Sequence, residues 1–354
     1  MREGFSFVAM RISVAPYRWL FNRPFPTAHG TRDGTDSVFV RIEHDDFIGY
    51  GEATLPPYLK EKPDQVIAAI RSMRLTNGIA LHDSAALIDE IEAKTPGLPA
   101  TRNALSMAVF DIQARMAGVP LWEYWHMFTP GEAMTVRTIA TAAIDDVEAR
   151  LDELPPSHVL KVKLGSSNDF GLLEMIKALD DRPLLLDANQ ACSSVTKTVE
   201  LLKQAGRVVG IEQPFAADDL EKHAELQRNT SVTVIADESI QGLEDLPKAE
   251  GVFTGVNIKL MKCGGLADAG LMIRDAHRMG LKVMLGSMSE SSLGCLAMYH
   301  LAGGVDCVDL DGPWLIANDP FDGMRLLDEP GWIPRKPGVG ARLRVDLPFT
   351  PIST

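Results

Sequence analysis

Cysteine is scarce in this chain of 354 residues, and the few cysteines present are scattered. None of their spacings resembles a metal knuckle or a Cys-x-x-Cys pair, so neither a cysteine metal site nor a disulfide framework is expected. Such usage is typical of a reducing compartment, which predicts a cytoplasmic protein. The cysteines are Cys192, Cys263, Cys295 and Cys307.

Long apolar runs and an excess of basic charge are also lacking. No apolar run reaches the ~18 residues that a transmembrane helix needs. The N-terminus has no charged segment followed by an uninterrupted apolar one, so no signal peptide is expected. Lys and Arg number 35 against 48 Asp and Glu, which gives a net charge of −13. Because phosphate binding depends on clustered basic side chains, this balance argues against nucleic acids and anionic membranes as partners.

The N-terminal third of the sequence has the pattern of a small α+β domain. Ser37–Glu43 alternates apolar and polar residues, a turn at Asp45–Asp46 follows, and Phe47–Glu52 resumes the extended pattern. These features predict an antiparallel hairpin. Arg102–Ala117 then carries apolar residues at helical spacing, which predicts a helix after the strands.

A repeat begins near residue 133, where short β-rich runs each end in polar residues and are followed by helical stretches. Successive strand ends from Lys163 onward lie 22 to 27 residues apart, a spacing typical of βα units. With the run Thr135–Ala140 there are eight candidate strands, the number that closes a (β/α)8, TIM-like barrel of the α/β class. A doubly wound open sheet is the rival fold, but no candidate strand is followed by a Gly-rich dinucleotide turn.

The polar strand ends form a candidate metal site. Lys161 and Lys163 are two residues apart and therefore point to the same face of their strand. Asp187, Glu212 and Asp237 end three consecutive strands, so their carboxylates can converge at the mouth of the barrel. Three hard oxygen ligands with room for water and substrate suit Mg²⁺.

Lys259 ends a later strand, so the lysine pair and Lys259 flank this metal site from opposite sides. A hydrogen on the carbon next to a carboxylate is barely acidic, and a metal on the carboxylate oxygens stabilises the enolate charge that its removal creates. A lysine acts as the base only when its pKa is lowered, which a second lysine and a divalent cation would do. With one lysine on each face, a proton can leave one side and return on the other.

Each of these residues also has a simpler interpretation than the catalytic one. A Lys-x-Lys pair on a strand is usually a solvated face, and a single acidic residue at a strand end more often caps the next helix. The regular spacing of the whole set favours a site. Lys262 is interpreted as a loop or surface lysine, while Glu238 and Glu290 are either partners of the lysines or helix N-terminal acids.

Five short motifs together resemble the muconate-lactonising subgroup of the enolase superfamily. They are Lys161–Lys163, Asp187–Asn189, Glu212–Pro214, Asp237–Ser239 and Ile258–Leu260. The resemblance spans most of the chain, and the motifs are specific in combination although each alone is weak.

The resemblance implies a capping domain over residues 1–125, completed by 316–354, and a modified (β/α)8 barrel over 126–315. It also implies that Lys163 and Lys259 are the two bases, and that Lys161 contacts the substrate carboxylate and lowers the pKa of Lys163.

The sequence Asp309-Leu310-Asp311 is similar to the motif with which dipeptide epimerases hold the α-ammonium group of the substrate. Two anions suit a cation and suit a second carboxylate badly. The alternative is that both residues only end the strand and prepare the following turn. By the same resemblance, Thr138 and Ser287 help to position the dipeptide.

The resulting hypothesis is a Mg²⁺-dependent dipeptide epimerase with a small-molecule substrate, and the resemblance also implies a homo-oligomer. Rival functions on the same scaffold are N-acylamino acid racemase, o-succinylbenzoate synthase and cycloisomerase; a non-catalytic carboxylate-binding barrel is a rival from another class. Capping loops at Tyr17–Gly30 and Leu55–Lys60 are expected to set specificity. They carry Arg18, Arg23 and Lys60, which are candidates for binding an acidic substrate side chain.

Overall fold

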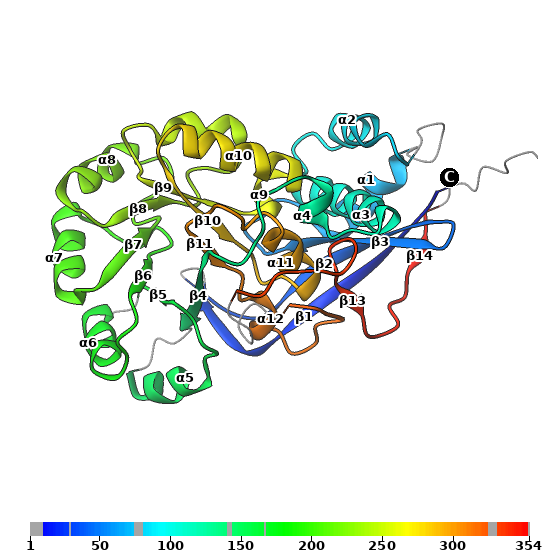
Figure 1. The fold of residues 1–354 in the computed structure, drawn as a ribbon. Helices are drawn as coiled ribbons and strands as arrows, with labels where there is room; N and C mark the ends of the chain where they lie inside the picture. The colour runs from blue at the N-terminus through cyan, green and yellow to red at the C-terminus, as the bar shows by residue number, and fades with distance from the viewer. Residues whose placement is uncertain are drawn as a thin grey trace, which may run out of the picture.

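The structure is a computed structural model that describes residues 10–27, 30–73, 81–139, 144–165, 168–324 and 331–352. The N-terminal part of the chain forms a sheet with helices, which lies beside a barrel (Figure 1). The C-terminal end of the chain returns to that sheet. Among the described residues, no helix is both long and apolar enough to span a membrane.

The N-terminal sheet is antiparallel and has the strand order β14-β1-β2-β3. The predicted hairpin is confirmed: β2 and β3 pair across a turn in which Asp45 has a φ of 50°. The strands are β1 (Arg11–Thr27), β2 (Gly30–His44), β3 (Phe47–Leu55) and β14 (Thr350–Pro351). The helices that follow β3 are α1 (Pro63–Ser72), α2 (Ser84–Lys94), α3 (Pro99–Ala117) and α4 (Leu121–Tyr124).

Helix α3 contains the predicted helix and packs closely on β3. The approach depends on glycine: a Cβ on Gly51 would lie 1.8 Å from the carbonyl oxygen of Ala104. Because the two backbones touch there, the helix is buried on nearly all sides, and Leu105 and Ile112 are fully enclosed.

The eight predicted strands form a closed barrel in chain order, which confirms the predicted fold class. All of its recorded neighbouring pairs are parallel. The strands are β4 (Met134–Ile139), β5 (Val159–Lys163), β6 (Leu184–Asp187), β7 (Val208–Glu212), β8 (Thr233–Ala236), β9 (Gly255–Ile258), β10 (Lys282–Gly286) and β11 (Cys307–Asp309).

The helices between these strands surround the barrel, and their apolar faces cover it (Figure 1). They are α5 (Val147–Glu153), α6 (Asp169–Leu179), α7 (Val195–Ala205), α8 (Leu220–Asn229), α9 (Leu260–Cys263), α10 (Leu266–Arg278) and α11 (Ser292–Tyr299), with 3-10 helices at Ile144–Asp146 and Leu243–Ala249.

The C-terminal segment after the barrel contacts the N-terminal part at several points. After α12 (Gly312–Leu315) come β12 (Phe321–Asp322) and β13 (Arg342–Leu343), which pair with each other. Phe21 bridges to Ile316, and β14 pairs with β1. The division of the chain at residues 125 and 316 stays a prediction.

The expected capping loop at Tyr17–Gly30 is wrong, because β1 continues as far as Thr27 and pairs with β2 along this stretch. Residues 28–29 lie outside the described residues. The segment after Leu55, in contrast, leaves the sheet as expected and forms a turn.

Candidate active site

The barrel strands carry apolar side chains at one end and charged ones at the other. On β5, Val159 lies in a small buried apolar cluster inside the barrel, and Lys161 and Lys163 follow at alternate positions on the same face. The register places Lys163 beside Asp187 and Asp187 beside Glu212. The predicted lysines and carboxylates are therefore brought together at the C-terminal end of the barrel, where active sites of this fold are built.

Lys161 lies at the centre of this charged group and is almost fully buried. Its Nζ is 2.7 Å from Glu212 Oε2, 3.0 Å from Asp187 Oδ2 and 2.7 Å from Asp309 Oδ2. Burial alone would lower the pKa of Lys161, but the surrounding carboxylates outweigh it and raise that pKa well above its usual range. Lys161 is therefore a fixed positive charge in this arrangement.

The two lysines expected to act as bases lie at opposite ends of the row of carboxylates. Lys163 Nζ donates to Asp187 Oδ2 at 2.6 Å, and its side chain is 26% exposed. Lys259 follows β9, caps α9, and donates to Asp237 Oδ2 at 2.8 Å. Because β5 and β9 are separated by the three carboxylate strands, the two ammonium groups flank the row from both sides.

The interpretation of Lys262 as a loop or surface lysine is wrong. Its side chain is buried, and Nζ lies 2.7 Å from both Oδ1 and the carbonyl oxygen of Asp237. The physical reason is local: α9 begins directly after Lys259, so one helical turn brings Lys262 back to the same side.

The carboxylates differ in their electrostatic surroundings. Burial and the neighbouring Asp187 raise the pKa of Glu212 to about 7. Burial acts on Asp187 in the same direction, but the ammonium groups of Lys161 and Lys163 dominate and lower its pKa. Burial would raise the pKa of Asp237 as well, but the ammonium groups of Lys259 and Lys262 outweigh burial and lower that pKa well below its usual range.

Within the described ranges, no group of three His, Cys, Asp or Glu side chains is already arranged to hold a metal ion. The donor set nevertheless fits Mg²⁺ by its chemistry, since three buried carboxylates end neighbouring strands. The buried guanidinium of Arg137 acts on Asp311 as a further cation, and four lysines face six carboxylates at the mouth. These residues are Lys161, Lys163, Lys259, Lys262, Asp187, Glu212, Asp237, Glu238, Asp309 and Asp311.

Two amides that sequence reasoning missed fix the positions of these carboxylates. Asn257 Nδ2 donates to Glu212 Oε1 at 2.7 Å, two residues before Lys259 on the same strand face. Gln213 Oε1 accepts from the backbone N–H of Asp237 at 3.0 Å. Gln213 lies within the motif Glu212–Pro214 and Asn257 directly precedes the motif Ile258–Leu260, and these positions are the signal that could have found them.

Asp309 ends the last barrel strand, and Asp311 caps α12 directly after it. Asp311 Oδ2 accepts from the backbone N–H of Thr138 at 3.0 Å. Asp309 Oδ1 is buried and has no hydrogen-bond partner among the described residues. Burial and the adjacent Asp309 raise the pKa of Asp311. Ser287 donates its backbone N–H to the carbonyl oxygen of Asp309 at 3.1 Å, so all four predicted substrate residues lie together.

Glu290 belongs to a buried junction between the N-terminal sheet and the barrel. Glu52 on β3 accepts from the Ser291 hydroxyl and, at 3.1 Å, from its backbone N–H. Burial, together with Glu52, raises the pKa of Glu290 to about 8. Burial also raises the pKa of Glu52 to about 7. Sequence reasoning missed Glu52, because its partner Ser291 lies 239 residues away in the chain. Glu238 accepts from Asn189 at 3.4 Å.

The expected basic residues of the cap differ in their partners. Arg18 is paired with Asp33 and Asp36, and Arg23 with Glu153. Lys60 is exposed. Two of the three candidates are therefore already neutralised by carboxylates.

Arg32, which the sequence reasoning missed, is in the opposite situation. Its guanidinium is half-buried, lies 5.5 Å from the Phe21 ring centroid, and has no carboxylate within ion-pair distance in the part of the chain that the structure describes. Its Nε is buried without a hydrogen-bond partner there. Burial lowers the pKa of Arg32, against the effect of the nearby Tyr58 hydroxyl, which lies 2.9 Å from Met288 Sδ at the mouth.

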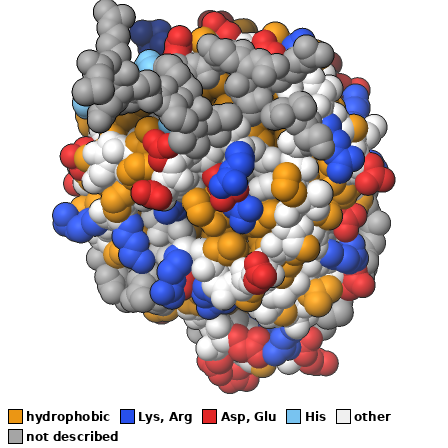
Figure 2. Space-filling model, turned by 90° about the vertical axis from the view of Figure 1, so that its right-hand side faces the viewer, with side chains coloured by type: hydrophobic (Ala, Val, Ile, Leu, Met, Phe, Trp, Pro, Cys, Tyr) orange, Lys and Arg blue, Asp and Glu red, His pale blue; other side chains and the backbone are white. Residues whose placement is uncertain are grey.

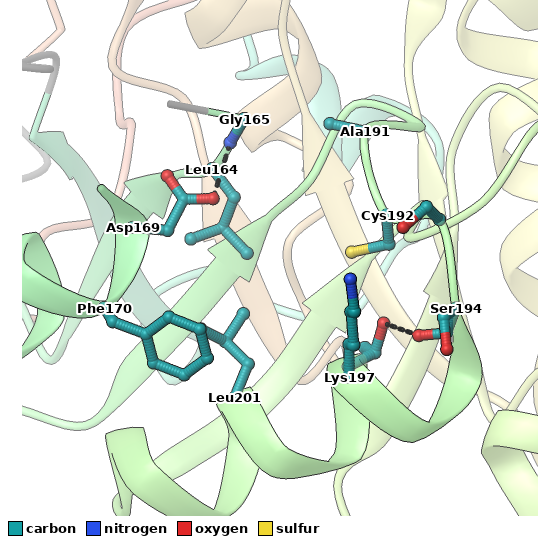
Figure 3. Close-up of a pocket in the computed structure, with 11 residues that line it drawn as sticks. Leu164, Gly165, Asp169, Phe170, Ala191, Cys192, Ser194, Lys197 and Leu201 are labelled. Atoms are coloured by element: carbon teal, nitrogen blue, oxygen red, sulfur yellow. Dashed lines mark hydrogen bonds between the residues drawn. The ribbon is translucent and has the colours of Figure 1, made fainter. Parts of the chain in front are cut away.

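A separate pocket of about 220 Å³ lies outside the barrel, where the loops after β5 and β6 meet α6 and α7 (Figure 3). Lys197, Cys192 and Asp169 border it, and Asp169 accepts from the backbone N–H of Gly165 at 3.0 Å (Figure 3). None of the predicted site residues lines this pocket. On the face of the molecule shown in Figure 2, basic and acidic side chains are interspersed.

The chain matches two family descriptions. Residues 9–124 match "Mandelate racemase / muconate lactonizing enzyme, N-terminal domain", and residues 145–347 match "Enolase C-terminal domain-like". The L-Ala-D/L-Glu epimerase of Bacteroides thetaiotaomicron is 34% identical over 338 residues, covering 94% of this chain and 87% of the relative. The L-Ala-D/L-amino acid epimerase of Flavobacterium johnsoniae is 32% identical, with 90% and 95% covered.

A solved structure of similar shape is the dipeptide epimerase of Methylococcus capsulatus, complexed with Mg and the dipeptide L-Arg-D-Lys. It is 28% identical, has a TM-score of 0.82, and the match covers 94% of this chain and 99% of that one. Matches to both parts of the chain, together with the closed barrel and its charged mouth, confirm the predicted superfamily. The chain therefore belongs to the mandelate racemase / muconate lactonizing enzyme family of the enolase superfamily.

Proposed function

We propose that this protein is a Mg²⁺-dependent dipeptide epimerase, an isomerase that inverts the α-carbon next to the C-terminal carboxylate. The observation that carries the proposal is the placement of Lys163 and Lys259 at opposite ends of the row of carboxylates. The names of its relatives support the same reaction class. A cytoplasmic location and a homo-oligomer stay predictions.

Each lysine has a distinct task in the proposed reaction. Lys163 and Lys259 exchange a proton with opposite faces of the α-carbon, one removing it and the other returning it. Lys161, whose charge is fixed, lies against the substrate carboxylate and binds it. Asp187, Glu212 and Asp237 would hold Mg²⁺, which when bound stabilises the negative charge that develops on that carboxylate.

The ammonium group of the dipeptide would bind at Asp309 and Asp311. Asp309 Oδ1 is a buried acceptor without a partner among the described residues, and such an atom is costly unless a donor reaches it. Substrates of the racemase, synthase and cycloisomerase rivals have a blocked or absent amine and leave this acceptor unsatisfied. A non-catalytic carboxylate-binding barrel does not require a lysine at both ends of the metal site.

The cap favours an acidic side chain on the substrate residue that is inverted. Arg32 is half-buried, lacks a carboxylate partner within the described ranges, and is close to Tyr58, whose hydroxyl contacts Met288 at the barrel mouth. A glutamate side chain would supply the missing anion. Arg32 therefore supports the proposal that Ala-Glu is preferred over Ala-Ala and over hydrophobic dipeptides.

The experiment is a mass-spectrometric screen of L-dipeptides in D₂O with Mg²⁺, scored for a gain of one deuterium at an α-carbon. Uptake confined to the C-terminal residue, and fastest for Ala-Glu, is expected. An Arg32→Met variant should reverse the preference for Ala-Glu over Ala-Leu, with Arg18→Met as the matched control because Arg18 is already paired. Deuterium uptake by N-acyl amino acids but by no dipeptide would contradict the proposal.

A further inference from the structure

A buried arginine lies close to the proposed ammonium site, on the other face of the barrel wall. Arg137 is on β4, directly before Thr138, and only 1% of it is exposed. Val136 belongs to the apolar cluster inside the barrel, so Thr138 shares its face and Arg137 points outward. A charge buried in this way is unfavourable unless partners offset it, so the arginine requires an explanation.

Two groups act on the guanidinium of Arg137, and both belong to one turn. Its Cζ lies 4.0 Å from the ring centroid of Trp314, within the range of a cation–π interaction. Burial and the neighbouring Asp309 raise the pKa of Asp311, and the charge of Arg137 acts against both. The backbone N–H of Trp314 donates to the carbonyl oxygen of Asp311 at 3.0 Å. Arg137 therefore connects the start of α12 to β4.

The carboxylates of Asp309 and Asp311 are held in different ways. Asp309 Oδ2 lies 2.7 Å from Lys161 Nζ, and its Oδ1 has no hydrogen-bond partner among the described residues. Asp311 Oδ2 accepts from the backbone N–H of Thr138 at 3.0 Å. Two successive residues of β4 thus act on Asp311, Thr138 through a hydrogen bond and Arg137 through its charge.

The same turn also contacts the cap. The carbonyl oxygen of Trp314 accepts from Asn22 Nδ2 at 2.8 Å, and Asn22 is on β1. A few residues further on, the backbone N–H of Ala317 donates to the carbonyl oxygen of Leu20 at 2.7 Å. The turn is therefore held by the cap on one side and by Arg137 on the other, which leaves the carboxylate at its start little freedom to move.

We infer that Arg137 is a positioning residue for the substrate ammonium group: its guanidinium, packed over Trp314, holds the Asp311 carboxylate in place from the outer side. Two neighbouring buried carboxylates repel each other, which favours their separation. A fixed cation on the side away from the substrate offsets this repulsion, so that Asp309 and Asp311 can both face one ammonium group. Arg137 lies on the outer face of β4 and acts only through Asp311.

The inference rests on the proposed function in one respect, namely that the substrate has a free ammonium group. Arg137→Met removes the charge, so KM for L-Ala-L-Glu should rise about tenfold or more, while kcat changes less than about threefold. Propionyl-glutamate has the same skeleton without the ammonium group and should react equally slowly with variant and wild type. Arg137→Lys keeps a cation over Trp314 and should recover most of the lost affinity.

Arg41→Met is the matched control. Arg41 makes a comparable contact, 4.6 Å from the ring centroid of Phe349, and its partners Ser13 and Glu43 belong to the N-terminal sheet. This variant should leave KM for both compounds unchanged. Arg137→Gln replaces the Met variant if the latter does not fold, as judged by its thermal melt. An equal loss with both compounds, or an unchanged KM for Ala-Glu, would overturn the inference.

Calorimetry in the presence of Mg²⁺ separates a failure of the inference from a failure of the proposed function. Wild type should bind Ala-Glu more tightly than propionyl-glutamate, and Arg137→Met should lose most of that preference. If wild type shows the preference but exchanges no α-proton, the proposed function fails, and loss of the preference in the variant still supports the role of Arg137. Full preference in the variant, or none in wild type, would overturn that role.

Discussion

The two ends of the barrel interior are built on the same strand faces, two residues apart, yet they have opposite chemistry. The inner end holds a buried apolar cluster of Val136, Val159, Leu185, Ile235 and Met284. The mouth lies two positions further along several of these strands and holds Thr138, Lys161, Asp187, Asp237 and Asp309. Glu212 is also at the mouth, and the residue two positions before it on β7 is a glycine, Gly210. A Cβ on that glycine would come within 3.0 Å of Leu185 and Ile235, so the side chains of its neighbours fill the space.

The difference between the two ends separates stability, which the inner end supports, from chemistry, which the mouth carries out. Burial of apolar surface at the inner end stabilises the fold, whereas the burial of like charges at the mouth is unfavourable until partners offset it. Because alternate residues of a strand share a face, the change from one chemistry to the other takes only one step of two residues. Substitutions at the two ends should therefore separate activity from stability.

The largest effect is expected from Lys163→Met at the mouth. Loss of a base lowers the rate of epimerisation by about 10³-fold, within the usual range for general acid–base catalysis. Asp187 keeps Lys161 as a partner, and Lys163 is partly exposed, so the melting temperature should change little. Steady-state kinetics and a thermal melt on the same preparation check both parts. Full activity of the variant would remove Lys163 from the reaction.

Leu185→Ala at the inner end should do the reverse. The side chain is buried, and its removal should cost about 2–5 kcal/mol of unfolding free energy through lost burial and a residual cavity. Below its melting transition the variant should epimerise within a few-fold of wild type. Chemical denaturation and kinetics at the same temperature test this, and a rate loss comparable to that of the lysine variant would show that the two ends are not separable.

Asp309→Asn should have an intermediate effect that depends on the substrate. The loss of a charge-assisted contact to the substrate ammonium group is worth about 1.5–3 kcal/mol, or roughly 10- to 100-fold in kcat/KM for Ala-Glu. Propionyl-glutamate lacks that ammonium group and should react equally slowly with variant and wild type. An equal loss for both compounds would indicate that Asp309 acts through Lys161 instead.

The smallest effect concerns Glu52 and Glu290 at the junction between the sheet and the barrel. Their pKa values, raised to about 7 and about 8, mean that the folded protein binds protons that the unfolded chain has released. Stability should therefore fall as the pH rises from about 5 through 8. Glu290→Gln has no charge to bury at high pH, so its free energy of unfolding at pH 9 should exceed that of wild type by about 1 kcal/mol. The variant should then melt a few degrees above wild type at pH 9 and near wild type at pH 5. A melting difference that does not vary with pH would contradict this.

The barrel could be predicted from the sequence because each strand ends in a residue of distinct chemistry at a regular interval. Asp187, Glu212 and Asp237 are visible in this way, and the structure brings them together. Lys262 could not be placed correctly, since that required knowing that a helix of four residues begins directly after Lys259.

The cap was harder to predict because its important contacts are distant in sequence. Glu52 meets Ser291 from a position 239 residues away. The prediction of a capping loop at Tyr17–Gly30 is wrong because β1 pairs with β2 along this stretch, with a register shift between Leu20 and Phe25. Long-range pairing thus overrides the local pattern.

The central claim is that two lysines serve opposite faces of one α-carbon, and separate half-reactions test it most directly. L-Ala-L-Glu and L-Ala-D-Glu are each incubated in D₂O with Mg²⁺ and wild type, Lys163→Ala or Lys259→Ala, and α-deuterium uptake is followed by mass spectrometry. We expect wild type to exchange both epimers, and each variant to retain exchange with one epimer and lose it with the other, reciprocally. Loss of exchange with both epimers in either variant, or the same surviving epimer in both variants, would contradict the account.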